Sequence, residues 1–188
     1  MERRDFLEWM VATGGITALG RLGSSDLLAM GRAAHDAPDG AAAPVLSTHA
    51  AALVTAAAER IIPKTETPGA TQAGVTRFAE VMLAGWYPAA DRARFVAGLP
   101  TLDARSRARD GKPFLTAGVA TQDAVLRQLD DEVTALRRTD GAAASAHWFG
   151  MLKFLTVWGY CTSEVGMRQT LQSWPQPMRY DGNVPVTR

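Results

Sequence analysis

From Leu46 onward, apolar side chains recur every three to four residues, which is the spacing of a helix that buries one face. Ser47 or Thr48 can cap the first such helix, and Pro63 ends it. A loop rich in Thr, Pro and Gly follows over residues 64–70. The apolar positions that we expect this first helix to bury are Leu53, Val54, Ala57 and Ile61.

The same spacing predicts further helices along the chain. A second helix is expected over residues 71–87, and a third around Phe95 and Leu102 with a kink at Pro100. The expected buried stripe of the second helix is Val75, Phe78, Met82 and Trp86. The predicted starting points of the fourth, fifth and sixth helices are Thr121, Ser145 and either Thr162 or Ser163.

After Trp174 the pattern changes, because Pro175, Pro177, Gly182 and Pro185 oppose regular structure. We find no strand signal and no repeat. The predicted fold is therefore all-α, an irregular bundle of about five to six helices with an extended, non-regular C-terminal tail. A tail of this kind is unusual unless it docks on something.

The N-terminus has a different pattern, which resembles an export signal. Arg3 and Arg4 are adjacent, and one residue later come the apolar pair Phe6 and Leu7. This is the core of a twin-arginine signal. A weakly apolar stretch of roughly a dozen residues follows over 9–22, the size of a signal's central region rather than of a membrane span.

We therefore expect residues 1–34 to be a twin-arginine signal segment, residues 35–45 a linker, and residues 46–188 the helical domain. Cleavage signals are weak, and the two candidates are residues 29–31 and 32–34. A leader of this type places the protein in the periplasm. The alternative is an N-terminal helix that stays on the protein.

The composition excludes several kinds of binding site and catalytic site. Its 188 residues are 47% hydrophobic and carry a net charge of +1, which gives no electrostatic footprint for nucleic acid. The single cysteine, Cys161, excludes an internal disulfide, and the three histidines lack metal-ligand spacing. Because no phosphate-binding or catalytic motif is present, we expect no catalytic residue, no metal and no cofactor in this chain.

Two segments contain more turn residues and polar side chains than a simple bundle needs. The first, residues 61–70, contains Pro68 and Gly69, and the second, residues 158–167, has glycines on both sides of a helix break. Each segment is either a local helix-to-helix connection or part of an interaction surface.

These two segments and the N-terminal signal are similar to those of the gluconate 2-dehydrogenase subunit 3 family, the small or gamma subunits of membrane-bound sugar dehydrogenases. The similarity runs from about Leu46 to the C-terminus. Cys161 departs from the aromatic residue expected at its position. The segments that carry the resemblance are residues 61–63, 67–70, 86–87, 95–102, 159–160, 162–164, 166–167, 180–182 and 184–185.

The resemblance implies an accessory subunit of an exported dehydrogenase. Members of this family bind a large FAD-containing subunit of the glucose-methanol-choline (GMC) oxidoreductase fold, and a multihaem cytochrome c subunit often completes the complex. The small subunit carries the signal read by the twin-arginine translocase, and the folded flavoprotein travels with it to the periplasmic side of the inner membrane. FAD then belongs to the partner, and haem c to the third subunit.

An obligate interface favours aromatic anchors. The resulting candidate interface residues are Thr67, Pro68, Gly69, Trp86, Tyr87, Tyr160, Thr162, Ser163, Glu164, Trp174 and Tyr180. We expect Trp148 and Trp158 to be core residues instead. Two alternatives stay open: a free-standing exported helical protein that binds a small ligand, and a tethering subunit whose uncut N-terminal segment is a membrane anchor.

Overall fold

The computed structural model describes residues 23–38, 40 and 44–172. The described part contains eight α-helices and no strand, which confirms the all-α prediction and exceeds the five to six helices expected. The helices are α2 (Ser24–Asp36), α3 (Thr48–Ile61), α4 (Val75–Gly85), α5 (Ala89–Gly98), α6 (Pro100–Asp110), α7 (Val119–Thr139), α8 (Gly141–Ala146) and α9 (Trp148–Thr162). A 3₁₀ turn, η2 (Phe114–Thr116), and a π-helical turn, η3 (Gly166–Thr170), complete the order.

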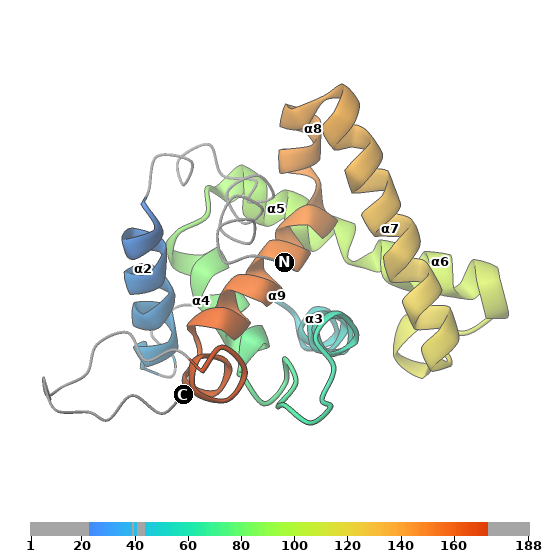
Figure 1. Cartoon of the computed structure of the whole chain (residues 1–188). Helices are drawn as coiled ribbons and strands as arrows, with labels where there is room; N and C mark the ends of the chain where they lie inside the picture. The colour runs from blue at the N-terminus through green and yellow to red at the C-terminus, as the bar shows by residue number, and fades with distance from the viewer. Residues whose placement is uncertain (1–22, 39, 41–43, 173–188) are drawn as a thin grey trace, which may run out of the picture.

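Helix α9 is the centre of the molecule (Figure 1). It contacts α2, α3, α4, α5, α7 and α8. Its sequence is apolar on nearly every side, and such a helix is stable in water only when neighbours surround it. Trp148 and Trp158 are both buried, as predicted, and Trp158 lies against Phe78 and Phe154.

The other helices are arranged around α9 on two sides. Helix α2 lies at one edge beside α4, while α6 and α7 extend to the opposite side (Figure 1). The predicted first helix is confirmed as α3, with Ser47 Oγ accepting a hydrogen bond from the Ala50 amide. Leu53, Val54 and Ala57 are buried and Ile61 is half-buried.

The predicted second helix is shorter at both ends than expected. Gly74 adopts a left-handed conformation (φ 68°), so α4 begins only at Val75. It ends at Gly85, because Tyr87 precedes Pro88 and a residue before proline avoids the helical region. The prediction that Trp86 lies in the buried stripe is wrong: 51% of its surface is exposed. Tyr87 is buried instead, with 4% exposed.

Three further boundaries differ from the prediction. Pro100 begins a new helix rather than kinking a long one, because proline fits the first turn of a helix. Gly118, not Thr121, precedes α7. His147, not Ser145, caps α9, since its Nδ1 accepts a hydrogen bond from the Phe149 amide at 3.2 Å. Ser145 lies inside the extra short helix α8, which the Asp140 side chain caps.

Residues 24–34, which the sequence pattern places in the signal segment, form most of α2 and pack against α4 and α9. Arg3, Arg4, Phe6, Leu7, Trp174 and Tyr180 lie outside the described residues. Within the described part, none of the helices has the length and hydropathy needed to cross a bilayer.

Candidate functional site

Tyr160 joins the two segments that the sequence singles out. Its ring is buried on α9, with 3% exposed, and its hydroxyl donates to the Pro68 carbonyl at 2.7 Å. Because that hydroxyl hydrogen is used, the Thr170 hydroxyl donates to Tyr160 Oη at 2.6 Å. The ring lies in a small second core that also contains Ala58, Ala70, Ala73 and Val75. Residues 61–70 and 158–167 are therefore neighbours in space.

A single carboxylate shapes the loop of residues 63–71. Glu59 accepts hydrogen bonds from the Lys64 amide at 3.0 Å and the Thr71 amide at 2.9 Å. Partial burial acts to raise the Glu59 pKa, but these hydrogen bonds together outweigh it, so the pKa lies below its usual value. Gly69 lies against this carboxylate, and a Cβ there would be 2.6 Å from the Lys64 amide nitrogen. Only glycine leaves enough room for the backbone at position 69 to lie this close to Glu59 and Lys64.

The corner after α9 is closed by hydrogen bonds between two hydroxyl side chains and the neighbouring backbone. Ser163 Oγ donates to the Tyr160 carbonyl at 2.7 Å and accepts from the Gly166 amide at 2.9 Å. Thr162 Oγ1 donates to the Trp158 carbonyl at 2.8 Å. A Cβ on Gly166 would overlap the Tyr160 carbonyl oxygen. Of the two predicted caps, Thr162 and Ser163, it is Ser163 that accepts a hydrogen bond at the start of the following turn. That turn is the π-helical η3 and not a separate α-helix, as the prediction had it.

A cleft of about 570 Å³ lies between α2, the start of α4 and this corner. The second sequence segment borders it through residues 162–165 and 167, and the first segment ends two residues before Gln72, another lining residue. Its rim has both signs of charge, since Arg32 and Asp36 come from α2 and Glu164 from the corner. The lining residues are Arg32, His35, Asp36, Gln72, Ala73, Gly74, Arg77, Thr162, Ser163, Glu164, Val165 and Met167.

His35 connects α2 to α9 at the edge of the cleft. Its Nε2 donates to the Gly159 carbonyl at 2.8 Å, and its ring stacks on Phe78 with 4.9 Å between centroids. Burial lowers the His35 pKa more than the Gly159 carbonyl and Asp36 raise it, so the ring favours the neutral form. Arg77 donates to the carbonyls of His35 and Ala37, which end α2. A cation at that end also suits the helix dipole.

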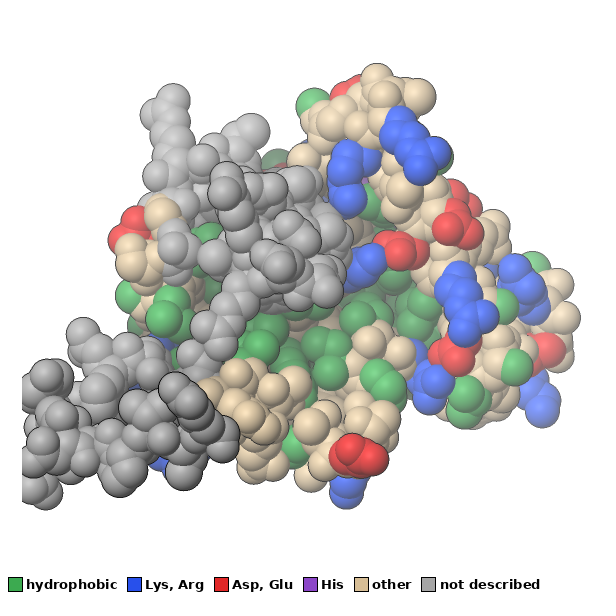
Figure 2. Space-filling view, in the orientation of Figure 1, with side chains coloured by type: hydrophobic (Ala, Val, Ile, Leu, Met, Phe, Trp, Pro, Cys, Tyr) green, Lys and Arg blue, Asp and Glu red, His purple; other side chains and the backbone are tan. Residues whose placement is uncertain are grey.

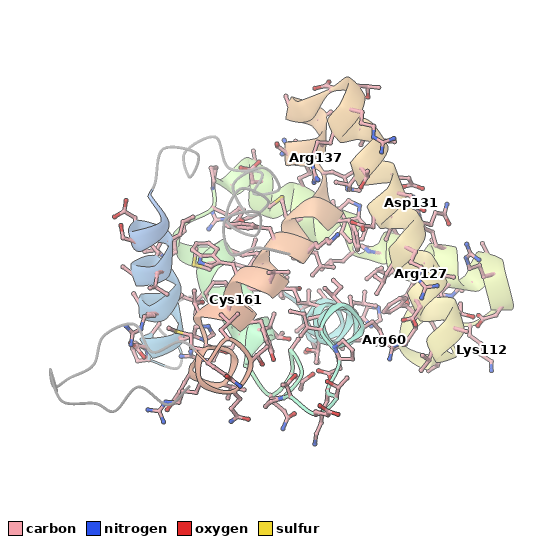
Figure 3. All side chains as sticks on the ribbon, in the orientation of Figure 1. Arg60, Lys112, Arg127, Asp131, Arg137 and Cys161 are labelled. Carbon is pink, nitrogen blue, oxygen red and sulfur yellow. The ribbon has the colours of Figure 1, made fainter. Side chains whose placement is uncertain are left out.

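A second, shallower hollow of about 250 Å³ lies between α3, α7 and α9. Arg60 forms a two-pronged ion pair with Asp123, at 2.8 and 3.0 Å, and Arg127 lies on α7 nearby (Figure 3). Lys153 pairs with Asp130 at 2.6 Å. Charged side chains gather over α6 and α7, whereas apolar ones fill the visible surface beside α3 and α9 (Figure 2). The ion pairs fasten α7 to the centre of the molecule.

The predicted interface residues fall into three groups. Glu164 is exposed and pairs with Arg168 at 3.0 Å, and Trp86 is exposed as well. Thr67 and Pro68 are half-buried in the loop. The remaining described candidates are buried within this chain: Gly69, Tyr87, Tyr160, Thr162 and Ser163.

The sequence reading missed three cleft residues, Arg32, His35 and Arg77. Arg32 lies in the predicted signal segment and His35 is the first residue of the predicted linker, while Arg77 lies on a helix face with no motif. No pattern in the sequence links positions 35 and 159, so this contact could not be found without the fold. Burial raises the pKa of the Cys161 thiol to about 11, so this thiol stays protonated at neutral pH. No group of metal-ligating side chains is found among the described residues.

Comparisons with curated proteins and with solved structures found no match. A family model described as gluconate 2-dehydrogenase subunit 3 matches residues 48–182, which is most of the chain. The matched range includes the loop of residues 61–70, Tyr160 and the Ser163 corner, and it begins after α2. The chain therefore belongs to the gluconate 2-dehydrogenase subunit 3 family.

Proposed function

We propose that this chain is the non-catalytic small subunit of an exported FAD-dependent dehydrogenase that oxidises a sugar, polyol or glycoside. Its role is to support twin-arginine export, assembly and stability of the flavoprotein subunit. Family membership over residues 48–182 carries this proposal, because the family is one of dehydrogenase subunits. The flavin and the catalytic base belong to the GMC-type partner, and a cytochrome c subunit passes the electrons on.

The surface around the cleft suits a partner protein. The loop of residues 61–70 and the corner at Ser163 are rigid, because Glu59, Tyr160 and Ser163 tie their backbones down. A rigid surface loses little conformational entropy when it binds. Helix α4 runs from this cleft to Trp86, and its 11 residues span about 16 Å. Contact at both ends of α4 is compatible with the large interface of an obligate complex.

Trp86 is the side chain that we expect to anchor the partner outside the cleft. It is the largest exposed apolar side chain of the described residues, and it follows the last turn of α4. Buried tryptophans are frequent sites of high binding energy in interfaces. The proposed role explains why the sequence keeps an aromatic residue at a position that faces water in the isolated subunit.

The test is co-expression with the flavoprotein encoded next to this chain. We expect a one-to-one complex that contains FAD, while the chain alone binds no flavin. Trp86→Ala should weaken the complex about tenfold or more without lowering the melting temperature of the small subunit. Val119→Ala is the matched control, because Val119 is similarly exposed but lies at the start of α7.

Two results would contradict the proposal. One is sugar oxidation with a dye acceptor by the purified chain alone. The other is a stable monomer that ignores the flavoprotein and shows ligand-dependent melting, which would favour a free-standing binding protein that uses the cleft. Equal effects of Trp86→Ala and Val119→Ala would reject Trp86 as an anchor and leave the subunit role standing.

A further inference from the structure

Helix α2 precedes the residues that the family model matches, yet it is part of the hydrophobic core. Leu27 is 3% exposed and Ala34 is 2% exposed, and Leu27 belongs to the main core cluster of the chain. The family match begins only at residue 48. Helix α2 therefore lies outside the matched range, although it covers a face of α4 and α9 that would otherwise be exposed to water.

Two hydrogen bonds between α2 and α9 hold α2 in place. The indole Nε1 of the fully buried Trp158 donates to the Leu27 carbonyl at 3.0 Å. At the other end of α2, His35 donates to the Gly159 carbonyl. Removing α2 would leave the Trp158 N–H without this acceptor, and an unmatched buried donor is costly.

The helices also approach closely at one glycine. A Cβ built on Gly31 would lie 2.6 Å from a side-chain carbon of Thr162, closer than real contacts allow. Glycine inside a helix normally costs about 1 kcal/mol relative to alanine, so its presence here has a packing reason. The sequence of α2 is therefore fitted to the folded domain.

We propose that the exported subunit keeps α2, and that any hydrolytic removal of the twin-arginine leader cuts the chain before Gly23. Residues 29–31 and 32–34, the cleavage candidates read from the sequence, both lie inside this packed helix. A cut at either place would separate Leu27 from the core and remove the acceptor of Trp158. The predicted position of the cut rests on the proposed export. The structural role of α2 does not depend on it.

The first experiment measures the mass and N-terminal sequence of the subunit recovered from the periplasm after expression of the full chain with its flavoprotein. The expected N-terminus lies at or before Gly23. An N-terminus at Ser24 or at any later residue would overturn the inference. If no subunit reaches the periplasm, the export proposal fails, and the second experiment decides the role of α2 by itself.

The second experiment uses full-length variants in the purified complex and needs no export. Leu27→Ala should lower the melting temperature by about 5–15 °C, because it opens a cavity in the core. Gly31→Ala should lower it too, although the same change in an unpacked helix raises stability. Ala33→Ser is the control on the exposed face of α2 and should shift it by less than about 2 °C. Unchanged melting in Leu27→Ala and a rise in Gly31→Ala would overturn the inference.

Discussion

Tyr160 and Tyr87 are almost equally buried, but their hydroxyls have different surroundings. Tyr160 Oη makes two hydrogen bonds that join the loop of residues 61–70 to η3. Tyr87 Oη is buried but has no hydrogen-bond partner among the residues that the structure describes. Burial, with a smaller contribution from Asp91, raises the Tyr87 pKa far above its usual value. The Tyr160 hydroxyl therefore connects two segments of the chain, whereas the unpaired Tyr87 hydroxyl destabilises the fold.

The two tyrosines form a matched pair of variants. Tyr160→Phe should lower the free energy of unfolding by about 1–2 kcal/mol, because it removes both hydrogen bonds and leaves the Pro68 carbonyl unpaired. Tyr87→Phe should leave stability unchanged or raise it, since it removes an unpaired buried hydroxyl. Urea unfolding followed by circular dichroism measures both. Equal losses in the two variants would show that the Tyr160 bonds contribute nothing specific.

Side-chain environments of this kind follow only partly from sequence. The pattern of residues 158–167 indicated a capped corner, and Ser163 does cap it. The sequence pattern could not place Trp86 and Tyr87, because α4 ends two residues before the predicted end, and residues beyond a helix end no longer follow its buried and exposed faces. That ending depends on Pro88 and on what packs against α4, which a periodic pattern does not contain.

At the level of elements, the junction of α2, α4 and α9 depends on His35. The neutral ring donates to the Gly159 carbonyl, stacks on Phe78, and has Asp36 and Arg77 as charged neighbours. Arg32 and Glu164 also line the cleft that His35 borders. Burial holds the His35 pKa below 6.5, the usual value. A proton added to the ring therefore costs more in the folded chain than in the unfolded one.

This asymmetry predicts a pH dependence of stability. Below pH 6.5 the unfolded chain binds a proton at His35 before the folded chain does, so stability falls as the pH drops through the range below 6.5. We expect a lower free energy of unfolding at pH 5.5 than at pH 7.5, measured by urea unfolding. The window stays above the range in which the carboxylates titrate.

His35→Gln is the control, because glutamine keeps an N–H donor for the Gly159 carbonyl but does not titrate. The decrease in the free energy of unfolding from pH 7.5 to pH 5.5 should be smaller in this variant but should not disappear. Burial also lowers the pKa of His147, the cap of α9, and this group acts in the same direction. An unchanged fall in His35→Gln would assign the whole effect to His147 and contradict a role for His35.

The elements themselves were largely predictable. The 3.6-residue period identified α3, α4, α7 and α9, because each has a buried stripe or a long apolar run. The period could not identify α8, which is six residues of small side chains, or separate α5 from α6. It also could not recognise α2 as part of the domain, because a weakly apolar segment behind a twin-arginine signal reads equally well as leader.

For the whole molecule, α2 is the element that follows the predicted export signal and already belongs to the folded domain. The predicted signal residues lie before Gly23, and α2 starts at Ser24 and packs on α4 and α9. An export signal attached this closely to a folded core suits a route that carries folded proteins across the membrane. It also suits the proposed role of a subunit that takes a flavin-loaded partner with it, because a partner exported in the folded state would receive its FAD before export.

Replacing Arg3 and Arg4 together by lysine tests this arrangement in the cell. The substitution keeps both positive charges but removes the guanidinium groups, which bind in a planar geometry that an ammonium group cannot reproduce. We expect the flavoprotein's dehydrogenase activity to move from the periplasmic to the cytoplasmic fraction, with most of the periplasmic activity lost. The purified complex should keep its melting temperature, because both positions precede α2. Unchanged periplasmic activity would refute the export signal, whereas loss of the complex from both fractions would show that these arginines support folding rather than transport.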